Sequence, residues 1–214
     1  TPRDYYVTIP GVSGDQRDKL THAGIYGVDV SMATLESIYG IDITYYARVN
    51  FTSLIRIVDA LGGIDVYSEY AFEGRGYQFQ EGMNHMDGEA ALAFSRERYS
   101  FESGDNQRGK NQEAVLTAIL QKAMSPALLA NASELITSVS DCVETNMTRT
   151  EMAKFINMQL SDAASWEIES TAATGTGDSQ ACYSSGSQLL YVMWPDEASV
   201  AEISKKMQQV LSGQ

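Results

Sequence analysis

The sequence is short of basic residues and has no long apolar run. Its 214 residues carry 15 Lys and Arg against 28 Asp and Glu, which gives a formal net charge of −13. This acidity argues against non-specific binding to duplex DNA, which needs a basic surface. A local basic pocket stays compatible with it. The longest apolar runs, residues 90–94 and 189–194, fall far short of the roughly 20 apolar residues of a membrane helix.

Cysteine and histidine are also scarce, with two of each. Cys142 and Cys182 have no partners at zinc-site spacing. Buried free thiols and a disulfide between them both stay open. His22 and His85 are isolated, so neither a paired-histidine metal site nor a Ser-His-Asp set is supported. The Gly-x-Ser-x-Gly and Walker motifs are absent as well, which excludes the commonest hydrolase and nucleotide-binding signatures.

The remaining composition is that of a globular domain, with 43% hydrophobic and 20% charged residues. The length suits a single domain, and no repeat or convincing linker divides it. The chain opens at Thr1 directly before a strand-like segment, and we expect further residues upstream in the natural protein.

Hydrophobic periodicity predicts alternating strands and helices. Strands are expected over residues 5–9, 43–49, 64–67, 166–172 and 189–194. Helices are expected over residues 29–39, 51–61, 87–94, 107–124, 127–139, 148–160 and 195–211. Residues 69–84 are interpreted as an excursion or hairpin. The alternation favours an α/β fold with a central mixed sheet covered by helices on both faces.

Helix-end signals support several of these elements. Gly40 stands where a C-terminal cap belongs, and Asp87 is a good N-cap. Thr148 and Glu151 have the spacing of a capping box. Residues 51–61 form the cleanest amphipathic helix of the chain.

Arginine is the informative residue type, because Arg96, Arg98 and Arg108 fall close together in an acidic chain. In extended backbone, Arg96 and Arg98 would point to the same side. Arg108 opens a long helix, whose free N–H groups and positive dipole end favour phosphate. Guanidinium groups clasp phosphate bidentately, so the set suits a diphosphate. The alternative is surface salt bridges with the nearby carboxylates Glu97, Glu102 and Asp105.

Another arginine and a carboxylate, Arg3 and Asp4, stand just ahead of the first strand. A carboxylate beside arginines in a phosphate site suggests Mg²⁺, which takes few protein oxygens and leaves the rest to phosphate and water. The pair alone is a weak signal.

An ordered set of short motifs extends these observations along the chain. It comprises residues 2–4, 9–11, 18–23, 46–51, 57–64, 82, 88–98, and the Asp105-x-x-Arg108-x-x-x-Gln112 pattern. In order and spacing, the chain resembles the LytR–CpsA–Psr family of cell-envelope phosphotransferases over residues 2–124. Residues 125–214 are expected to be the C-terminal α/β part of the same domain, so that residues 1–214 form a single domain without its N-terminal segment.

The resemblance implies a phosphotransferase that moves a phospho-glycan, such as teichoic acid or capsule, from a polyprenyl-pyrophosphate carrier to a peptidoglycan hydroxyl. Members lie outside the cytoplasmic membrane on one N-terminal membrane helix, and no nucleic acid is involved. That location favours the Cys142–Cys182 disulfide. The lipid occupies an apolar tunnel between sheet and helices. The tunnel candidates here are Phe51, Leu54, Ile55, Val58, Val115 and Ile119, although plain core packing predicts the same pattern.

Site residues are carried over by position. Arg96, Arg98, Arg108 and Gln112 match the pyrophosphate-binding set. Arg3, Asp4 and Arg98 are the catalytic candidates, with Asp4 at the Mg²⁺. Lys19 and Asp59 match recurring positions without an implied role, and for Asp59 a structural hydrogen bond is the alternative.

Two departures from the family keep a second hypothesis open. The family's upstream segment, with an Asp that shares the Mg²⁺, is absent from this sequence. Asn111 stands where many members have Arg, which removes one charge. The alternative is therefore a non-catalytic module of the cell envelope that binds or senses a polyprenyl-phosphate lipid.

Overall fold

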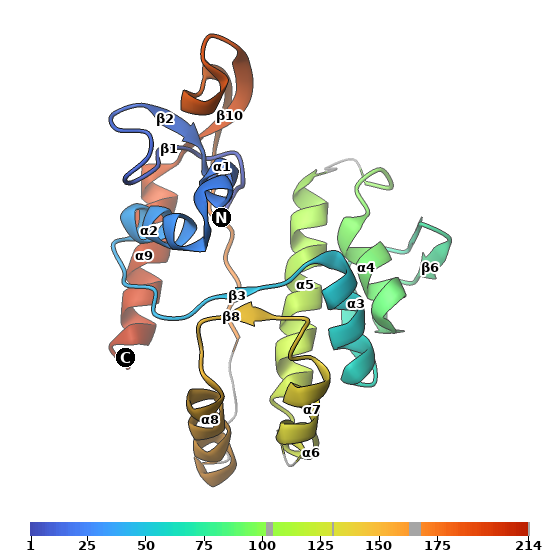
Figure 1. The fold of residues 1–214 in the computed structure, drawn as a ribbon. Coiled ribbons are helices and arrows are strands. Elements are labelled where there is room, and N and C mark those ends of the chain that lie inside the picture. Colours follow the sequence, from blue (N-terminus) through green and yellow to red (C-terminus); the bar gives the residue numbers. More distant parts are fainter. Residues whose placement is uncertain (102–104, 130, 163–167, 214) are drawn as a thin grey trace. The chain divides into compact units, whose positions relative to one another are not determined.

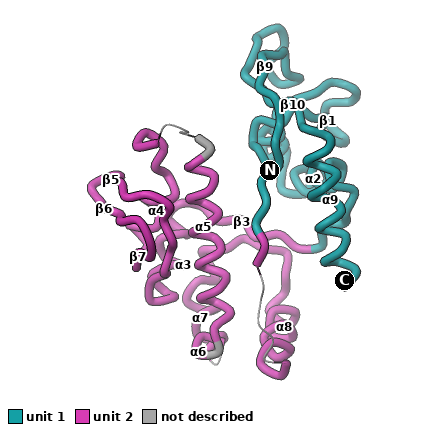
Figure 2. The backbone as a smooth tube through the Cα atoms, turned by 180° about the vertical axis from the view of Figure 1, so that it is seen from behind, with its two compact units in different colours: residues 1–44, 170–214 teal, residues 45–169 magenta. Residues whose placement is uncertain are grey.

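The computed structural model describes residues 1–101, 105–129, 131–162 and 168–213. The chain folds into two compact units, coloured separately in Figure 2. Unit 1 comprises residues 1–44 and 170–214, and unit 2 comprises residues 45–169. Each unit is described by itself.

Unit 1 joins the two ends of the chain (Figure 1). Its N-terminal elements are β1 (Tyr6–Thr8), β2 (Arg17–Lys19), α1 (Leu20–Ala23), the 3₁₀ helix η1 (Gly24–Tyr26) and α2 (Val28–Tyr39). Its C-terminal elements are β9 (Gly175–Ala181), the 3₁₀ helix η2 (Tyr183–Ser185), β10 (Leu189–Pro195) and α9 (Glu197–Leu211). Strands β1 and β2 pair antiparallel, as do β9 and β10.

A parallel bridge between Tyr5 and Met193 links the two strand pairs of unit 1. The backbone N–H of Met193 donates to the carbonyl of Asp4 at 2.7 Å. Tyr5 is fully buried, and its hydroxyl donates to the carbonyl of Thr174. Helix α2 ends at Gly40, whose φ of 63° is the left-handed cap conformation predicted from the sequence. The strands of unit 1 therefore hold the N-terminal segment against the C-terminal hairpin.

Unit 2 contains a hairpin-rich half and a helical half. Its first elements are β3 (Ala47–Arg48), α3 (Phe51–Ala60), β4 (Ile64–Ser68), β5 (Phe72–Gly74), β6 (Tyr77–Phe79) and β7 (Gly82–Met86). They are followed by α4 (Gly88–Arg96), α5 (Asp105–Ala123), α6 (Pro126–Leu129), α7 (Ala132–Ser138), β8 (Glu144–Thr145) and α8 (Arg149–Asp162). Antiparallel pairs form between β4 and β7, β5 and β6, and β3 and β8.

Helices α3 and α4 of unit 2 each begin at a side-chain cap. Asn50 accepts the N–H of Ser53, and Asp87 accepts the N–H of Ala90, as the sequence predicted for Asp87. Figure 1 shows α3, α4 and α5 side by side. Their buried faces enclose a core with β4 and β7, made of residues such as Val58, Ile64, Val66, Met86, Phe94 and Val115.

The α/β character predicted from the sequence is confirmed, but the single central sheet is not. The described strands form five two-stranded antiparallel sheets. Only residues 47–48 of the predicted strand 43–49 are in a strand, because the backbone N–H of Ile43 bonds instead to the Glu36 side chain. The predicted strand 166–172 lies partly outside the described residues, and residues 168–172 form no strand. The predicted helix 127–139 is two shorter helices, α6 and α7.

Candidate functional site

The end of α4 carries the first arginine of the predicted site. Arg96 is the last residue of the helix, so the predicted extended backbone over Arg96 is wrong. Its guanidinium carbon lies 4.5 Å from the centre of the Phe51 ring, a cation–π contact. Among the described residues, Arg96 makes no ion pair. An aromatic face holds a cation without neutralising its charge, so the guanidinium keeps its attraction for anions.

Glu97 organises the turn that follows α4. Its side chain is buried, and its Oε1 accepts the backbone N–H groups of Arg98, Tyr99 and Ser100 at 3.0, 2.7 and 3.0 Å. Burial raises the pKa of Glu97, but these hydrogen bonds outweigh burial and leave the pKa below its usual value. The carboxylate is therefore charged and committed to the turn, and it is not the arginine salt-bridge partner that the alternative interpretation proposed. Glu102 lies outside the described residues.

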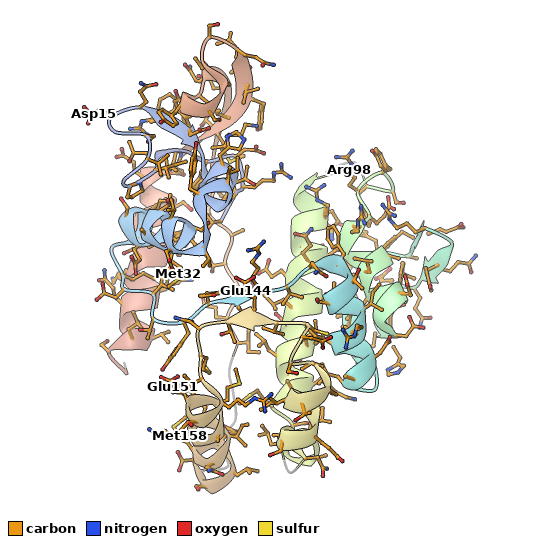
Figure 3. All side chains as sticks on the ribbon, viewed as in Figure 1. Asp15, Met32, Arg98, Glu144, Glu151 and Met158 are labelled. Atoms are coloured by element: carbon orange, nitrogen blue, oxygen red, sulfur yellow. The ribbon has the colours of Figure 1, made fainter. Side chains whose placement is uncertain are left out.

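Arg98 follows directly and is exposed (Figure 3). Its Nη2 donates to the hydroxyl of Tyr99 at 2.5 Å, and its guanidinium carbon lies 4.6 Å from the centre of that ring. Arg108 is in the first turn of α5 and half-buried, and Gln112 lies one turn further and is exposed. The structure therefore places Arg96, Arg98 and Arg108 where α4 ends and α5 begins.

Asp59 and Asn111, which the sequence singled out as a recurring family position and a departure from the family, both make structural contacts in this region. Asp59 Oδ1 accepts the N–H of Gly88 at 2.8 Å, which ties the end of α3 to the start of α4 and confirms the structural alternative for Asp59. Gly88 is required there, since a Cβ would lie 2.3 Å from the Ile55 carbonyl oxygen. Asn111 is buried on α5 and donates to the carbonyl of Phe94 at 3.2 Å. It links α5 to α4 and fills the family's arginine position with a helix-packing contact.

Unit 1 holds the other predicted pair, Arg3 and Asp4. Arg3 is exposed, and Asp4 is half-buried and forms an ion pair with Lys19 at 2.9 Å. This contact gives the recurring Lys19 position a partner. Because the two units are described separately, a single site that includes Arg3, Asp4 and the unit 2 arginines stays a prediction.

A polar cluster in unit 1 escaped the sequence analysis. Fully buried Asp18 accepts from the backbone N–H groups of Lys19 and Ser184, and its Oδ1 lies 2.6 Å from His22 Nδ1. The Ser184 hydroxyl lies 2.9 Å from the same ring nitrogen. A catalytic triad uses both ring nitrogens, one for the serine and one for the carboxylate. The cluster is therefore a structural clasp between β2–α1 and η2. In the sequence, the only sign of this cluster is the i, i+4 spacing of Asp18 and His22, which can bring two side chains together on a helix.

The surroundings of Asp4 offer few protein ligands for Mg²⁺. Among the described residues, no group of three or more His, Cys, Asp and Glu side chains could hold a metal ion. Mg²⁺ in phosphate sites often uses only one or two protein carboxylates and takes its other ligands from phosphate and water. Asp4 can supply one such oxygen, with Lys19 in competition for it.

The tunnel candidates divide into core and surface residues. Val58 and Val115 are buried in the unit 2 core, and Leu54 and Ile119 are partly buried against it. Phe51 is 57% exposed and lies under Arg96. Ile55 is half-buried, and its backbone contacts the start of α4. For Val58 and Val115 the core-packing alternative holds within this unit, and the tunnel stays a prediction.

The two cysteines do not form the suggested disulfide. Cys142 and Cys182 are both buried free thiols, with Cys142 in unit 2 and Cys182 in unit 1. Cys182 packs beside Asp18. Burial, together with this carboxylate, raises the pKa of its thiol. Packing within each unit therefore accounts for both residues without a bridge.

Comparison with known proteins identifies the family. The sequence profile described as the LytR_cpsA_psr family matches residues 1–209, nearly the whole chain and both units. The chain belongs to this family. The match confirms the resemblance and extends it beyond residue 124, where the motifs alone ended.

Relatives and solved structures of the family agree. Enterococcus faecalis TagU, named a polyisoprenyl-teichoic acid–peptidoglycan teichoic acid transferase, is 39% identical over 153 residues, which cover 71% of this chain and 50% of that protein. The crystal structure of B. subtilis TagV aligns with a TM-score of 0.81 at 27% identity, over 99% of this chain and 82% of that one. A structure described as TagT bound to LI-WTA aligns with a TM-score of 0.73 at 26% identity, over 98% and 76% of the two chains.

The chain spans about half the length of the curated relatives that it matches. Within the residues that the structure describes, no helix combines the length and apolar character needed to cross a membrane.

Proposed function

We propose that this protein transfers a phospho-glycan from a polyprenyl-pyrophosphate carrier to a peptidoglycan hydroxyl. The observation that carries the proposal is the set of arginines where α4 ends and α5 begins, in a member of the LytR_cpsA_psr family. The name of the Enterococcus faecalis relative supports teichoic acid as the glycan and peptidoglycan as the acceptor.

In this proposal, Arg96, Arg98 and Arg108 bind the pyrophosphate, and Gln112 adds an amide donor one turn along α5. Phosphoryl transfer depends mainly on positioning and charge neutralisation. Fixed guanidinium groups meet both needs, since they hold the reacting phosphorus and stabilise negative charge on the departing polyprenyl phosphate. Arg3 would add a further cation to the phosphates from unit 1. The lipid chain would occupy an apolar tunnel with Phe51 and Leu54 among its lining.

Asp4 would hold Mg²⁺. When bound, the ion would neutralise phosphate charge and polarise the phosphoryl group. In the structure the Asp4 carboxylate forms an ion pair with Lys19 at 2.9 Å, which orients it. The assignment of Asp4 and the Mg²⁺ dependence are parts of the proposal that need their own measurement.

A second candidate function is binding of a polyprenyl-phosphate lipid without turnover. The ion pair between Asp4 and Lys19 favours it, because Lys19 already satisfies one oxygen of the proposed metal ligand. A binder would keep the arginine site and dispense with Mg²⁺.

We also propose a location at the outer face of the cytoplasmic membrane, with an N-terminal helix as anchor. The relatives' names place their substrates, teichoic acid and peptidoglycan, in the cell envelope. Protease accessibility of the natural full-length protein in intact cells would test this location, since an inward-facing domain would be protected until lysis.

The deciding experiment measures transfer of labelled phospho-glycan from a polyprenyl-pyrophosphate donor to peptidoglycan, using the natural full-length protein. We expect transfer that needs Mg²⁺, falls strongly in Asp4→Asn, and is abolished by chelation. Lipid binding without transfer in the presence of Mg²⁺ would select the second candidate. Neither binding nor transfer would refute the proposed function.

A further inference from the structure

A buried carboxylate lies in the middle of the arginine site. Glu97 is only 8% exposed and stands between Arg96 and Arg98 in the chain. By Coulomb's law, a negative charge beside a pyrophosphate site weakens anion binding. A carboxylate at this position must therefore have a favourable effect on the site that outweighs this repulsion.

The contacts of Glu97 identify that effect. One oxygen, Oε1, accepts three consecutive backbone N–H groups, those of Arg98, Tyr99 and Ser100. It also accepts the Ser100 hydroxyl at 3.2 Å. Hydrogen bonds to a charged acceptor are among the stronger ones in proteins, and three on adjacent amides fix the backbone of a turn. The backbone of the turn that carries Arg98 is thus held by hydrogen bonds to this carboxylate.

The same turn is hydrogen-bonded to strand β5. The Ser100 hydroxyl lies 2.9 Å from the carbonyl oxygen of Glu73 and can donate to it. At Gly74, a Cβ would lie 3.1 Å from Glu97 Oε2 and 3.3 Å from Glu97 Cβ. The absence of a side chain at Gly74 lets Glu97 lie close against the strand. Contacts with β5 therefore fix the position of the turn.

We propose that Glu97 is a positioning residue that fixes Arg98 for the pyrophosphate through the backbone of residues 98–100. This inference rests on the proposed function and deepens it. Glu97 touches no substrate atom in this role. The three N–H groups that Glu97 accepts partly offset its negative charge, and this limits its repulsion of the phosphates.

The Glu97→Gln variant separates the repulsion by the Glu97 charge from its anchoring of the turn, because the loss of each changes the affinity for an anion in opposite directions. Loss of a repelling charge would strengthen binding of an anion, whereas loss of the anchor would weaken it. We expect the affinity for geranylgeranyl pyrophosphate, measured by calorimetry, to fall about tenfold, since weaker hydrogen bonds leave the turn less ordered. Glu81→Gln, at an exposed carboxylate of the same unit, is the matched control and should leave the affinity unchanged. Unchanged or tighter binding by Glu97→Gln would overturn the proposal.

Gly74→Ala tests the same role without any change of charge. Its new Cβ would crowd the Glu97 carboxylate, so we expect an affinity loss of about two- to fivefold in a folded protein. A purely electrostatic role of Glu97 predicts no change in this variant. Gly74→Ala also keeps the proposal testable if Glu97→Gln fails to fold.

Hydrogen exchange separates this inference from the proposed function. The backbone amides of Arg98, Tyr99 and Ser100 should exchange faster in Glu97→Gln than in Glu81→Gln. If the wild-type protein binds no probe, the proposed function fails and Glu97 has no pyrophosphate site to position. If the wild type binds but exchange at these amides is the same in both variants, the positioning role is wrong and the proposed function stands.

Discussion

In unit 1, Asp4 and Asp18 lie against Lys19 and His22, whereas at the end of α4 in unit 2 the Arg96 guanidinium lies on an aromatic ring, as Arg17 of unit 1 does on Trp194. Asp4 pairs with Lys19, and buried Asp18 with His22. Arg96 lies instead on Phe51 and makes no ion pair among the described residues. A closed ion pair has little charge left for a ligand, but a cation on a ring keeps its charge. This contrast points to stability as the role of the Asp18 cluster and leaves the Arg96 charge available for the anion that we propose it binds.

The largest expected effect is on the stability of unit 1. Asp18→Ala removes a fully buried acceptor of two backbone N–H groups and of His22. Breaking a buried, charged network of this kind costs about 3–5 kcal/mol of the free energy of unfolding. Asp15→Ala, at an exposed aspartate three residues away, is the control. Denaturant unfolding that gives equal values for both variants would remove the role assigned to the clasp.

Acid should weaken the same clasp in the wild-type protein. Burial raises the pKa of Asp18, but hydrogen bonds from His22, Ser184 and the backbone outweigh it and leave the pKa lowered. A carboxyl with a lowered folded-state pKa contributes stability above its unfolded pKa of about 4, and this contribution is lost as the pH falls through the folded value. The difference in unfolding free energy between wild type and Asp18→Ala should therefore become smaller as the pH falls below about 4. A constant difference down to the acid limit would contradict the assignment.

In unit 2 the corresponding test is ligand binding. Arg108→Ala should lower the affinity for geranylgeranyl pyrophosphate about 10- to 100-fold, because a charge-assisted hydrogen bond to phosphate is lost. Arg48→Ala, at an exposed arginine paired with Glu144, is the matched control in the same unit. Isothermal calorimetry on both variants measures the contrast. Equal affinities would place the anion site elsewhere.

The smallest expected effect concerns the aromatic support of Arg96. Phe51→Leu keeps an apolar side chain but removes the ring, and should cost about 0.5–1 kcal/mol of pyrophosphate-lipid binding. Tyr67→Leu is a control with a similar exposure, 59% against 57% for Phe51. Thermal unfolding should be nearly unchanged in both. An affinity loss as large for Tyr67→Leu would show that the contact with Arg96 is unimportant.

Local signals predicted the helices and their ends well. The cap at Asp87, the left-handed Gly40 and the Thr148–Glu151 capping box are all present, since each depends on residues close in sequence. The sequence also named the candidate arginines, whose role in pyrophosphate binding stays a prediction; the structure places Arg96, Arg98 and Arg108 where α4 ends and α5 begins.

The misses depend on contacts between distant segments. Strand β9 has the sequence GTGDSQA, without apolar alternation, and forms because β10 pairs with it. Within residues 69–84, predicted to be an excursion or hairpin, β5 and β6 do form a hairpin, but β7, which pairs with β4 as far as Met86, is not predicted. Glu97 stood within the motif, but its function depends on backbone N–H groups and on β5, which side-chain patterns do not reveal. The disulfide that the resemblance favours is not present, since Cys142 and Cys182 are buried free thiols.

The most direct test of the central claim is a crystal structure of the protein with geranylgeranyl pyrophosphate. The account predicts that oxygen atoms of the pyrophosphate lie within hydrogen-bond distance of the guanidinium groups of Arg96, Arg98 and Arg108, with the lipid chain in an apolar channel. A pyrophosphate bound away from the end of α4, with these three side chains directed into solvent, would contradict it.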